Sequence, residues 1–157
     1  YNTARFFESV CLLREHFQPP ALTTDLIVGF PGETEEEFGQ SLDFIQKCAF
    51  SAMHIFPYSK RPGTPAAAMP DQVPRAVKEE RARRAAEAAA GMEQRYLEQW
   101  EEVEVLFEEE RDGLWWGHTT RYSRVGVESG ENLHNQLRQA AVTGVEQGWL
   151  RGRLVNS

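Results

Sequence analysis

The chain has 157 residues, of which 26% are charged and 41% hydrophobic, and its formal net charge is -7. This composition is typical of a folded soluble protein with one ordinary domain or two small ones, and it excludes a disordered chain. The negative charge gives no overall attraction to nucleic acid or to an anionic membrane, so any RNA contact must be a local patch. No apolar run is long enough for a membrane span, and the start, YNTARFFESV, is neither a signal peptide nor an initiator methionine. We therefore expect an excised piece of a longer protein.

The first part of the chain predicts a helix, a strand, a second helix and a second strand. TARFFESVCLLREHF spaces its apolar residues at helical intervals and ends at QPPA. ALTTDLIVGF has the density of a buried strand, and FSAMHIFPYS is a second short strand closed by Pro57. Strands separated by a helix favour a parallel sheet covered by helices. Because two strands cannot form such a sheet with a sizeable core, we expect the missing strands upstream of Tyr1.

The turn after the first strand, GFPGETEEEF, has the features of a ligand loop. Thr34 and Glu37 have the spacing of a capping box, and glutamates occupy the positive end of the second helix. Gly29, Pro31 and Gly32 could simply form a βα loop. The alternative is a ligand loop, because ligands collect at the carboxyl ends of parallel strands and glycine lets a flat ring or a phosphate approach the backbone. The glutamates argue against a phosphate, so a neutral or cationic ligand fits better.

The rest of the chain predicts a loop, a helix and an all-β module. The loop is SKRPGTPAAAMPDQVP, and the helix after it is rich in alanine and charge, which is typical of a solvated face or of a strap between domains. After Trp100 the sequence consists of short alternating segments separated by Gly, Asp and Asn. About five strands are expected, closed into a small barrel. We divide the chain into residues 1–73, the end of an α/β unit, 74–99, a linker helix, and 100–157, the β module.

The β module has a modest basic patch that contains aromatic residues. From Gly113 to Ser157 it has five Arg and three Glu, an excess of +2, whereas the preceding strand is mostly acidic. Guanidinium groups beside aromatic faces are typical of proteins that bind single-stranded RNA. Because neighbours on a strand point to opposite faces, we expect one of the paired tryptophans in the core and the other free to stack. The residues expected to contact RNA here are Trp115, Trp116, Arg121, Tyr122 and Arg124.

The two cysteines, Cys11 and Cys48, are far apart in the sequence and match no zinc or iron-sulfur spacing. We expect both to be small buried hydrophobic residues. No metal site and no catalytic residue are predicted in this chain. Without a disulfide framework, the reducing cytoplasm is the expected compartment.

Three segments in their order resemble the carboxyl half of radical SAM methylthiotransferases. They are TTDLIVGFPGETEEEF, MHIFPYSKRPGTPAAAM and DQVPRAVKEERARR, followed by the small β module. The resemblance covers nearly the whole chain, and it implies the end of a radical SAM (β/α) partial barrel, a linker helix and a TRAM domain, which is an OB-like RNA-binding β-barrel. HIFPYSKRPGTPAA is most similar to the branch that methylthiolates threonylcarbamoyladenosine beside the tRNA anticodon. The alternatives are the isopentenyladenosine branch, the branch that acts on a ribosomal protein, and a non-catalytic RNA-binding module.

This resemblance implies S-adenosylmethionine and two 4Fe-4S clusters as cofactors, and the tRNA anticodon arm as a partner. The cysteine motif and the N-terminal domain that hold the clusters are absent from this chain. We therefore expect the chain to be inactive alone and to act with the N-terminal part of the same polypeptide. Lys60 and Arg61 are expected to meet tRNA phosphates, with ordinary solvated charges as the alternative. By position, the adenine of S-adenosylmethionine is expected against Ile27, Gly29, Phe30, Phe56, Pro57 and Tyr58, where Gly29 would allow its close approach.

Overall fold

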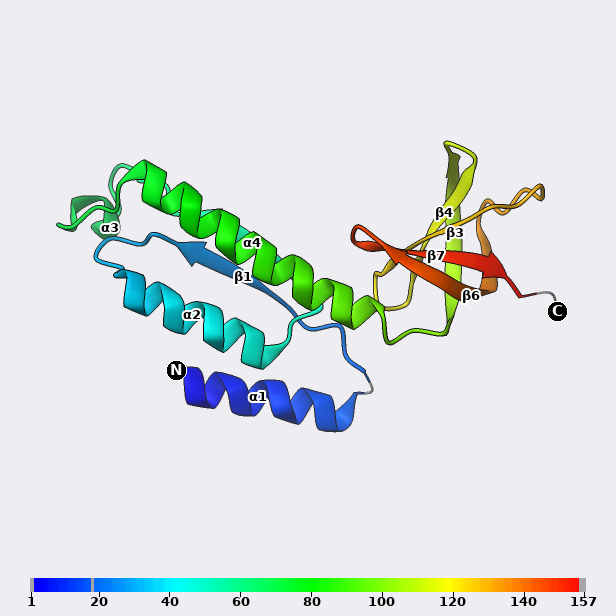
Figure 1. Cartoon of the computed structure of the whole chain (residues 1–157), viewed down its shortest axis with the longest axis horizontal. Helices are drawn as coiled ribbons and strands as arrows, with labels where there is room; N and C mark the ends of the chain where they lie inside the picture. The colour runs from blue at the N-terminus through cyan, green and yellow to red at the C-terminus, as the bar shows by residue number, and fades with distance from the viewer. Residues whose placement is uncertain (1, 18, 156–157) are drawn as a thin grey trace. The chain divides into compact units, whose positions relative to one another are not determined.

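The computed structural model of the chain describes residues 2–17 and 19–155. It contains two units, Tyr1–Met92 and Glu93–Ser157, each with its own core (Figure 1). The order helix, strand, helix, strand predicted for the first part of the chain is confirmed. The elements of the first unit are α1 (Thr3–His16), β1 (Thr23–Val28), α2 (Glu35–Cys48), β2 (Ala52–Pro57), the short α3 (Pro65–Ala68) and most of α4 (Arg75–Leu97).

The sheet of the first unit has two parallel strands, paired in register from Thr23 with Ala52 to Val28 with Pro57. Because side chains alternate along a strand, Leu26 and Val28 turn toward α2 and α4 and pack with their apolar residues. The opposite side of the sheet has no helix over it among the described residues. We call this side the open face; its exposed residues are Thr23, Asp25, Ile27, His54 and Phe56.

Helix α4 is part of the first unit over most of its length. Ala85 is fully buried against Val28 and Phe38, and Met92 is buried in a second cluster with residues of α1 and α2. The boundary therefore differs from the expected linker over residues 74–99, since residues 75–92 pack on the sheet. The small alanine side chains, which suggested a solvated face, are what allows this helix to lie close to the strands.

Helix α2 begins with the predicted capping box, which is confirmed. The Glu37 N–H donates to Thr34 Oγ1 over 3.1 Å, and the Thr34 N–H donates to Glu37 Oε2 over 2.9 Å. Two backbone donors at the helix start thus have partners, and the carboxylate lies at the positive end of the helix dipole. The cap fixes where the loop after β1 ends and the helix begins.

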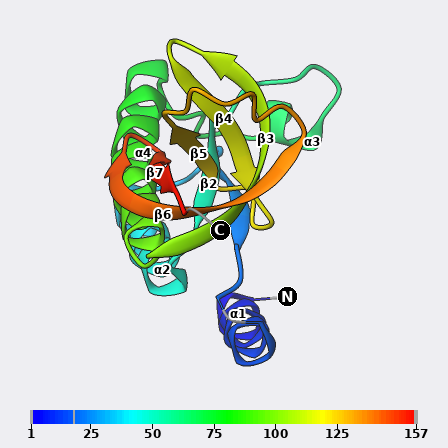
Figure 2. The same ribbon diagram turned by 90° about the vertical axis from the view of Figure 1, so that its right-hand side faces the viewer.

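The second unit is a closed barrel with strand order β3-β4-β5-β7-β6, as predicted for a small five-stranded module (Figure 2). Alternate residues of β3, Val103, Val105 and Phe107, fill its interior together with Leu150. All neighbouring strands are antiparallel except β5 and β7, which run parallel. The strands are β3 (Glu102–Arg111), β4 (Leu114–Thr119), β5 (Arg124–Val127), β6 (Gln136–Glu146) and β7 (Trp149–Leu154).

The cysteines are both free in the structure. Cys48 is fully buried in the core of the first unit, as predicted, and Cys11 is half-buried. Burial raises the pKa of the Cys48 thiol, which keeps it protonated. Among the described residues, no group of three or more His, Cys, Asp or Glu side chains is arranged to hold a metal ion. In the same part of the chain, no helix has the length and apolar character needed to cross a membrane.

Candidate functional site

A hollow of about 540 Å³ lies against the open face of the sheet, at the carboxyl ends of β1 and β2. Two large apolar side chains, Ile27 and Phe56, are about half exposed there, at 55% and 50%, and they are partners in the strand register. Four of the six residues expected to contact adenine line this hollow. The lining residues are Asp25, Ile27, Phe56, Pro57, Tyr58, Ser59, Arg61, Thr64 and Ala66.

Gly29 is placed differently from the expectation. Its φ of +70° lies in the left-handed region, and a Cβ atom on it would lie 2.2 Å from Cγ of Lys78. The expectation that the absent side chain leaves room for an adenine ring is therefore wrong on this side of the residue, because the stem of Lys78 fills the space. The glycine is required by the backbone conformation and by the close approach of α4.

Phe30 does not line the hollow but contacts its wall. Its ring packs edge-on against Tyr58, with 5.4 Å between ring centroids. Tyr58 is held in turn by Lys78, whose Nζ donates to the Tyr58 carbonyl over 2.9 Å. The Tyr58 hydroxyl is buried without a hydrogen-bond partner in the described part of the chain. Helix α4 thus holds the loop after β2 through Lys78.

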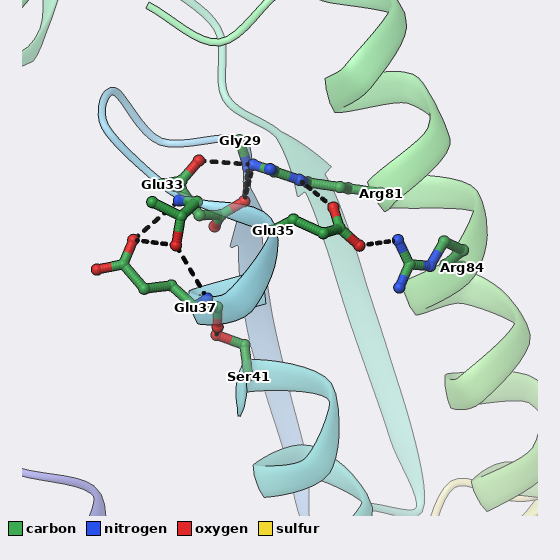
Figure 3. Close-up of polar contacts among 8 residues, drawn as sticks. Gly29, Glu33, Glu35, Glu37, Ser41, Arg81 and Arg84 are labelled. Carbon is green, nitrogen blue, oxygen red and sulfur yellow. Dashed lines mark hydrogen bonds and ion pairs between the residues drawn. The ribbon is translucent and has the colours of Figure 1, made fainter. Parts of the chain in front are cut away.

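A second tie to α4 holds the loop after β1 (Figure 3). Arg81 is only 5% exposed, and its guanidinium donates to the Glu33 carboxylate over 2.7 Å and to the Glu33 carbonyl over 3.0 Å. The same carboxylate accepts the Gly29 N–H over 2.8 Å. Glu33 therefore closes the glycine loop, and Arg81 neutralises the buried charge that does so.

Glu35 extends these contacts to the start of α2. Its carboxylate accepts hydrogen bonds from Arg84 and, over 3.4 Å, from Arg81. The hydrogen bond from Arg84 lowers the pKa of Glu35 below its ordinary value, and Arg81 adds to the effect. We call Gly29, Glu33, Glu35, Arg81 and Arg84 the Arg81 network. Its guanidinium groups are paired with carboxylates within the network.

Sequence reasoning missed Arg81 and Lys78 as individual residues, because both stand among many charged residues of one helix, although DQVPRAVKEERARR, a segment that carries the family resemblance, contains them. It also missed Asp25, Ser59 and Thr64, which supply polar groups to the hollow. The glutamates of this loop were interpreted only through the dipole of the helix that follows. The role of Glu33, whose carboxylate accepts the Gly29 N–H and so closes the loop, was missed.

Lys60 and Arg61 are both exposed in the loop after β2. Arg61 lines the hollow, and its carbonyl accepts a hydrogen bond from the Thr64 hydroxyl over 2.8 Å, which shapes the loop before α3. Lys60 does not line the hollow. Of these two neighbouring cations, only Arg61 is therefore positioned to contact a ligand in the hollow.

The paired tryptophans of the barrel are both covered. Trp115 lies in the core, as expected for one of the two. Trp116 points to the other face, but it is only 9% exposed. The Arg124 guanidinium lies 3.9 Å from the centre of its ring, and Trp149 packs against it edge-on at 4.7 Å. The expectation that the second tryptophan is free to stack is therefore wrong, because a cation and a third indole cover it.

The remaining residues of the predicted RNA patch are more accessible. Tyr122 is 87% exposed in a tight turn, with a positive φ of 60°. Arg121 is half-buried, with its guanidinium 5.0 Å from the centre of the Trp100 ring. Arg151, which sequence reasoning did not single out, lies 5.2 Å over Trp149 and pairs with Glu146 over 3.1 Å. Tyr122 is thus the one residue of this predicted set that presents an open aromatic face.

A second hollow, of about 380 Å³, lies on the outside of the barrel where β5 pairs with β7. Gly126 lines it, and the rings of Trp149 and Trp116 lie 2.9 Å and 3.1 Å from the place where the Cβ of this residue would be, so only glycine fits there. The residues that line this hollow are Leu114, Gly126, Glu128, Thr143, Arg151, Gly152 and Arg153. Two arginines, Arg151 and Arg153, thus line this hollow together with Glu128.

Comparison with known proteins found relatives along the whole chain. A threonylcarbamoyladenosine tRNA methylthiotransferase of Bacillus subtilis is 35% identical over 99% of the chain, which corresponds to 36% of that protein. A tRNA-2-methylthio-N(6)-dimethylallyladenosine synthase of Acetivibrio thermocellus is 38% identical over 99% of the chain and 33% of its own length. A synthase of the same name from Corynebacterium urealyticum is 53% identical over 52% of the chain and 15% of its own length. The chain spans about a third of the length of the two relatives that match it throughout. No protein-family model matches the chain.

Proposed function

Because the chain belongs to the methylthiotransferase family, we propose that it is the carboxyl-terminal part of a radical SAM enzyme that methylthiolates an adenosine of tRNA. One observation carries the proposal: two relatives aligned over 99% of the chain are both named as tRNA methylthio enzymes. The open parallel sheet supports it, since such a sheet is completed by further strands in a larger protein. The proposed substrate implies a cytoplasmic protein.

In this proposal the first unit contributes one wall of the S-adenosylmethionine site. The exposed side chains of Ile27 and Phe56 form a flat apolar surface, which fits a neutral adenine ring. Pro57 and Tyr58 continue the wall, and Gly29 and Phe30 hold it from behind through Lys78 and Tyr58. S-adenosylmethionine and the two 4Fe-4S clusters supply the radical chemistry of the family when bound. The ligands of the clusters are proposed to lie in the rest of the parent protein, since the described residues hold no metal-binding group.

The barrel is proposed to be a TRAM domain that contacts the anticodon arm of tRNA. The support for this contact comes from a few residues of the barrel and not from overall charge, because the net charge of the chain is -7 and the β3 strand is acidic. Tyr122 offers a stacking face, and Arg121 and Arg124 lie one residue before it and two residues after it in the sequence. Lys60 and Arg61, both exposed in the loop after β2, are proposed to meet tRNA phosphates, and only Arg61 of the two lines the first hollow.

Among the possible nucleosides, threonylcarbamoyladenosine is proposed because HIFPYSKRPGTPAA is most similar to that branch. The dimethylallyladenosine relative aligns equally far, so that nucleoside is the second candidate. To test this, the full-length protein is reconstituted anaerobically with iron and sulfide and incubated with tRNA and S-adenosylmethionine. Mass spectrometry of the digested tRNA then identifies the product nucleoside. Methylthiolation of a ribosomal protein, or no methylthio product at all, would contradict the proposal.

The RNA contact is tested on the 157-residue chain with a fluorescent anticodon arm in a salt series. Replacing Arg121 and Arg124 by alanine is expected to flatten the log-log salt dependence by about one unit or more if each neutralises one phosphate. Arg75 and Arg83, exposed on α4, give a control double variant with the same change in charge. Equal salt slopes for the two double variants would show that Arg121 and Arg124 do not form the phosphate contacts. Binding of RNA by a full-length protein without methylthiolation would favour a non-catalytic module.

A further inference from the structure

The open face of the β1–β2 sheet has the character of a protein interior. Parallel sheets are almost always covered on both faces, and here α2 and α4 cover only one. On the other face, Ile27 and Phe56 are about half exposed side by side. If the chain is about a third of a longer enzyme, as proposed above, this face lines an internal cavity of that enzyme.

Two polar side chains lie in the middle of this face. Asp25 and His54 are partners in the register of the parallel strands, one step before the pair formed by Ile27 and Phe56. Asp25 lines the hollow, and the His54 ring lies 6.4 Å from that of Phe56. Within residues 2–17 and 19–155, neither side chain forms a hydrogen bond or an ion pair. Groups of this kind need partners once the face is covered, because a buried polar group without a hydrogen bond is costly.

We propose that Asp25 and His54 together bind the hydrogen-bonding edge of an adenine base that lies against Ile27 and Phe56. The inference rests on the proposed function, in which both the cofactor and the substrate contain an adenine ring. It goes beyond that function because it gives Asp25 and His54 the role of recognising the base that stacks on the apolar wall.

The chemistry of the pair matches this ligand. A carboxylate only accepts hydrogen bonds, so Asp25 requires an N–H donor, and the exocyclic amino group of adenine is one. A neutral imidazole has one N–H to donate, which suits a ring nitrogen of the same base. An adenosine that carries a substituent on this amino group keeps one N–H. The neighbouring Phe56 supplies an aromatic face for stacking.

A binding test uses the chain alone and the four histidine rings as reporters. Adenosine at millimolar concentration is expected to shift the ring resonances of His54 in NMR spectra and to leave those of His16, on the exposed side of α1, unchanged. Purine riboside, which has the same ring without the amino group, is expected to shift them less. Asp25→Ala should remove the difference between the two nucleosides. An unshifted His54, or equal shifts with both nucleosides, would overturn the inference.

A second test uses the reconstituted full-length protein and separates the two sources of adenine. Asp25→Ala and His54→Phe are expected to lower kcat/KM for tRNA by about tenfold or more. Asp25→Asn, which keeps an acceptor oxygen, should retain more activity. Asp43→Ala and His16→Phe, on the exposed surfaces of α2 and α1, are the matched controls.

Cleavage of S-adenosylmethionine without tRNA is measured in the same variants. A parallel loss of cleavage and a raised KM for S-adenosylmethionine assign the pair to the adenine of the cofactor. Unchanged cleavage with lost methylthiolation assigns it to the adenosine of tRNA. Full activity of both variants would overturn the inference and leave the proposed function intact. A wild-type protein without tRNA methylthiolation would instead overturn the proposed function, and the NMR test would still decide the role of the pair.

Discussion

The parallel sheet of the first unit and the barrel of the second bury their strands in different ways. The barrel closes on itself, so every strand has two neighbours, and its interior side chains pack against each other, against the end of α4 and against Trp100 and Leu133 of the loops. Within the described part of the chain, helices cover the two-stranded sheet on one face only, and the loops of the sheet are held by α4 and by buried ionic contacts. The difference is that the barrel closes with its own strands, whereas the sheet leaves one face uncovered among the described residues.

The comparison predicts where each unit is most vulnerable: in its apolar core for the barrel, and in the contacts to α4 for the sheet. The two units can be followed separately. All four tryptophans lie after residue 92, so their fluorescence reports on the barrel. The helices lie mainly before that residue, so far-ultraviolet circular dichroism at the helical band reports on the first unit.

The largest effect is expected for Phe107→Ala in the barrel. Phe107 is fully buried at the centre of the core, and removing its ring leaves a cavity that costs about 3–5 kcal/mol of unfolding free energy. Urea unfolding followed by tryptophan fluorescence measures the loss. Leu137→Ala, on the outside of β6 with 57% of its surface exposed, is the control and should change the free energy by about 0.5 kcal/mol or less. Equal losses in the two variants would show that the barrel interior is not a packed core.

Arg81→Met tests whether the sheet depends on its ionic ties. The substitution leaves the nearly buried carboxylate of Glu33 without its partner, which is expected to cost about 3 kcal/mol. Circular dichroism during urea unfolding measures the loss in the first unit. The control is Arg83→Met on the exposed side of the same helix, where ion pairs with Glu80 and Glu87 are worth less than about 1 kcal/mol. Adding Glu33→Gln to Arg81→Met should restore part of the loss, and no restoration would contradict the charge argument.

Gly29→Ala tests the close contact between the loop and α4. The alanine would be strained by its positive φ and would meet Lys78, for an expected loss of about 2 kcal/mol. Gly32→Ala has a similar φ of +83° with no atom within 4 Å of the new Cβ, so it should lose only about 1 kcal/mol. Thermal unfolding followed by circular dichroism compares them. In a Lys78→Ala background, which removes the Lys78 bond to Tyr58 from the comparison, the further loss caused by Gly29→Ala should fall to about that of Gly32→Ala; if it does not, the stem of Lys78 is not the obstacle.

The smallest effect is expected from pH. The folded pKa of Glu35 is lowered by Arg84 and Arg81, so its contribution to stability is present above the ordinary carboxyl pKa of 4.5 and is lost as pH falls through the folded value. The first unit should therefore lose stability as pH falls below the ordinary carboxyl pKa of 4.5, and Glu35→Gln should lose less over the same interval. Unfolding at several pH values measures both slopes. Glu36→Gln is the control, because Glu36 forms no ion pair among the described residues; a wild-type slope in Glu35→Gln would contradict the prediction.

Much of this fold was predictable from local patterns in the sequence. Thr34 and Glu37 define the start of α2, and the alternation in β3 marks which residues fill the barrel. These features depend on neighbours along the chain, so a short window contains them. The apolar wall of the hollow was predictable for the same reason, since Ile27 and Phe56 stand near the ends of strands that the sequence marks clearly.

The rest depends on contacts between distant segments. Arg81 meets Glu33 across 48 positions, and nothing in the charged sequence of α4 distinguishes it from its exposed neighbours. Trp116 is covered by Trp149, a residue that approaches only when β7 joins β5. The packing of α4 was hidden by its alanines, whose small side chains carry little hydrophobic signal but allow close approach. Sequence patterns predicted the elements, and long-range pairing decided which surfaces stay free.

The parallel pairing of β5 with β7 also sets the order of events during synthesis. Val125 pairs with Leu150 and Val127 with Gly152, so the barrel cannot close until its last strand has left the ribosome. Until then the edges of β5 and β6 that later pair with β7 have unpaired backbone groups, and such edges can pair with other nascent chains. The first unit has no such requirement on late residues, because its strands end at Pro57. A pause in translation before residue 149 would therefore leave the barrel open to misassembly.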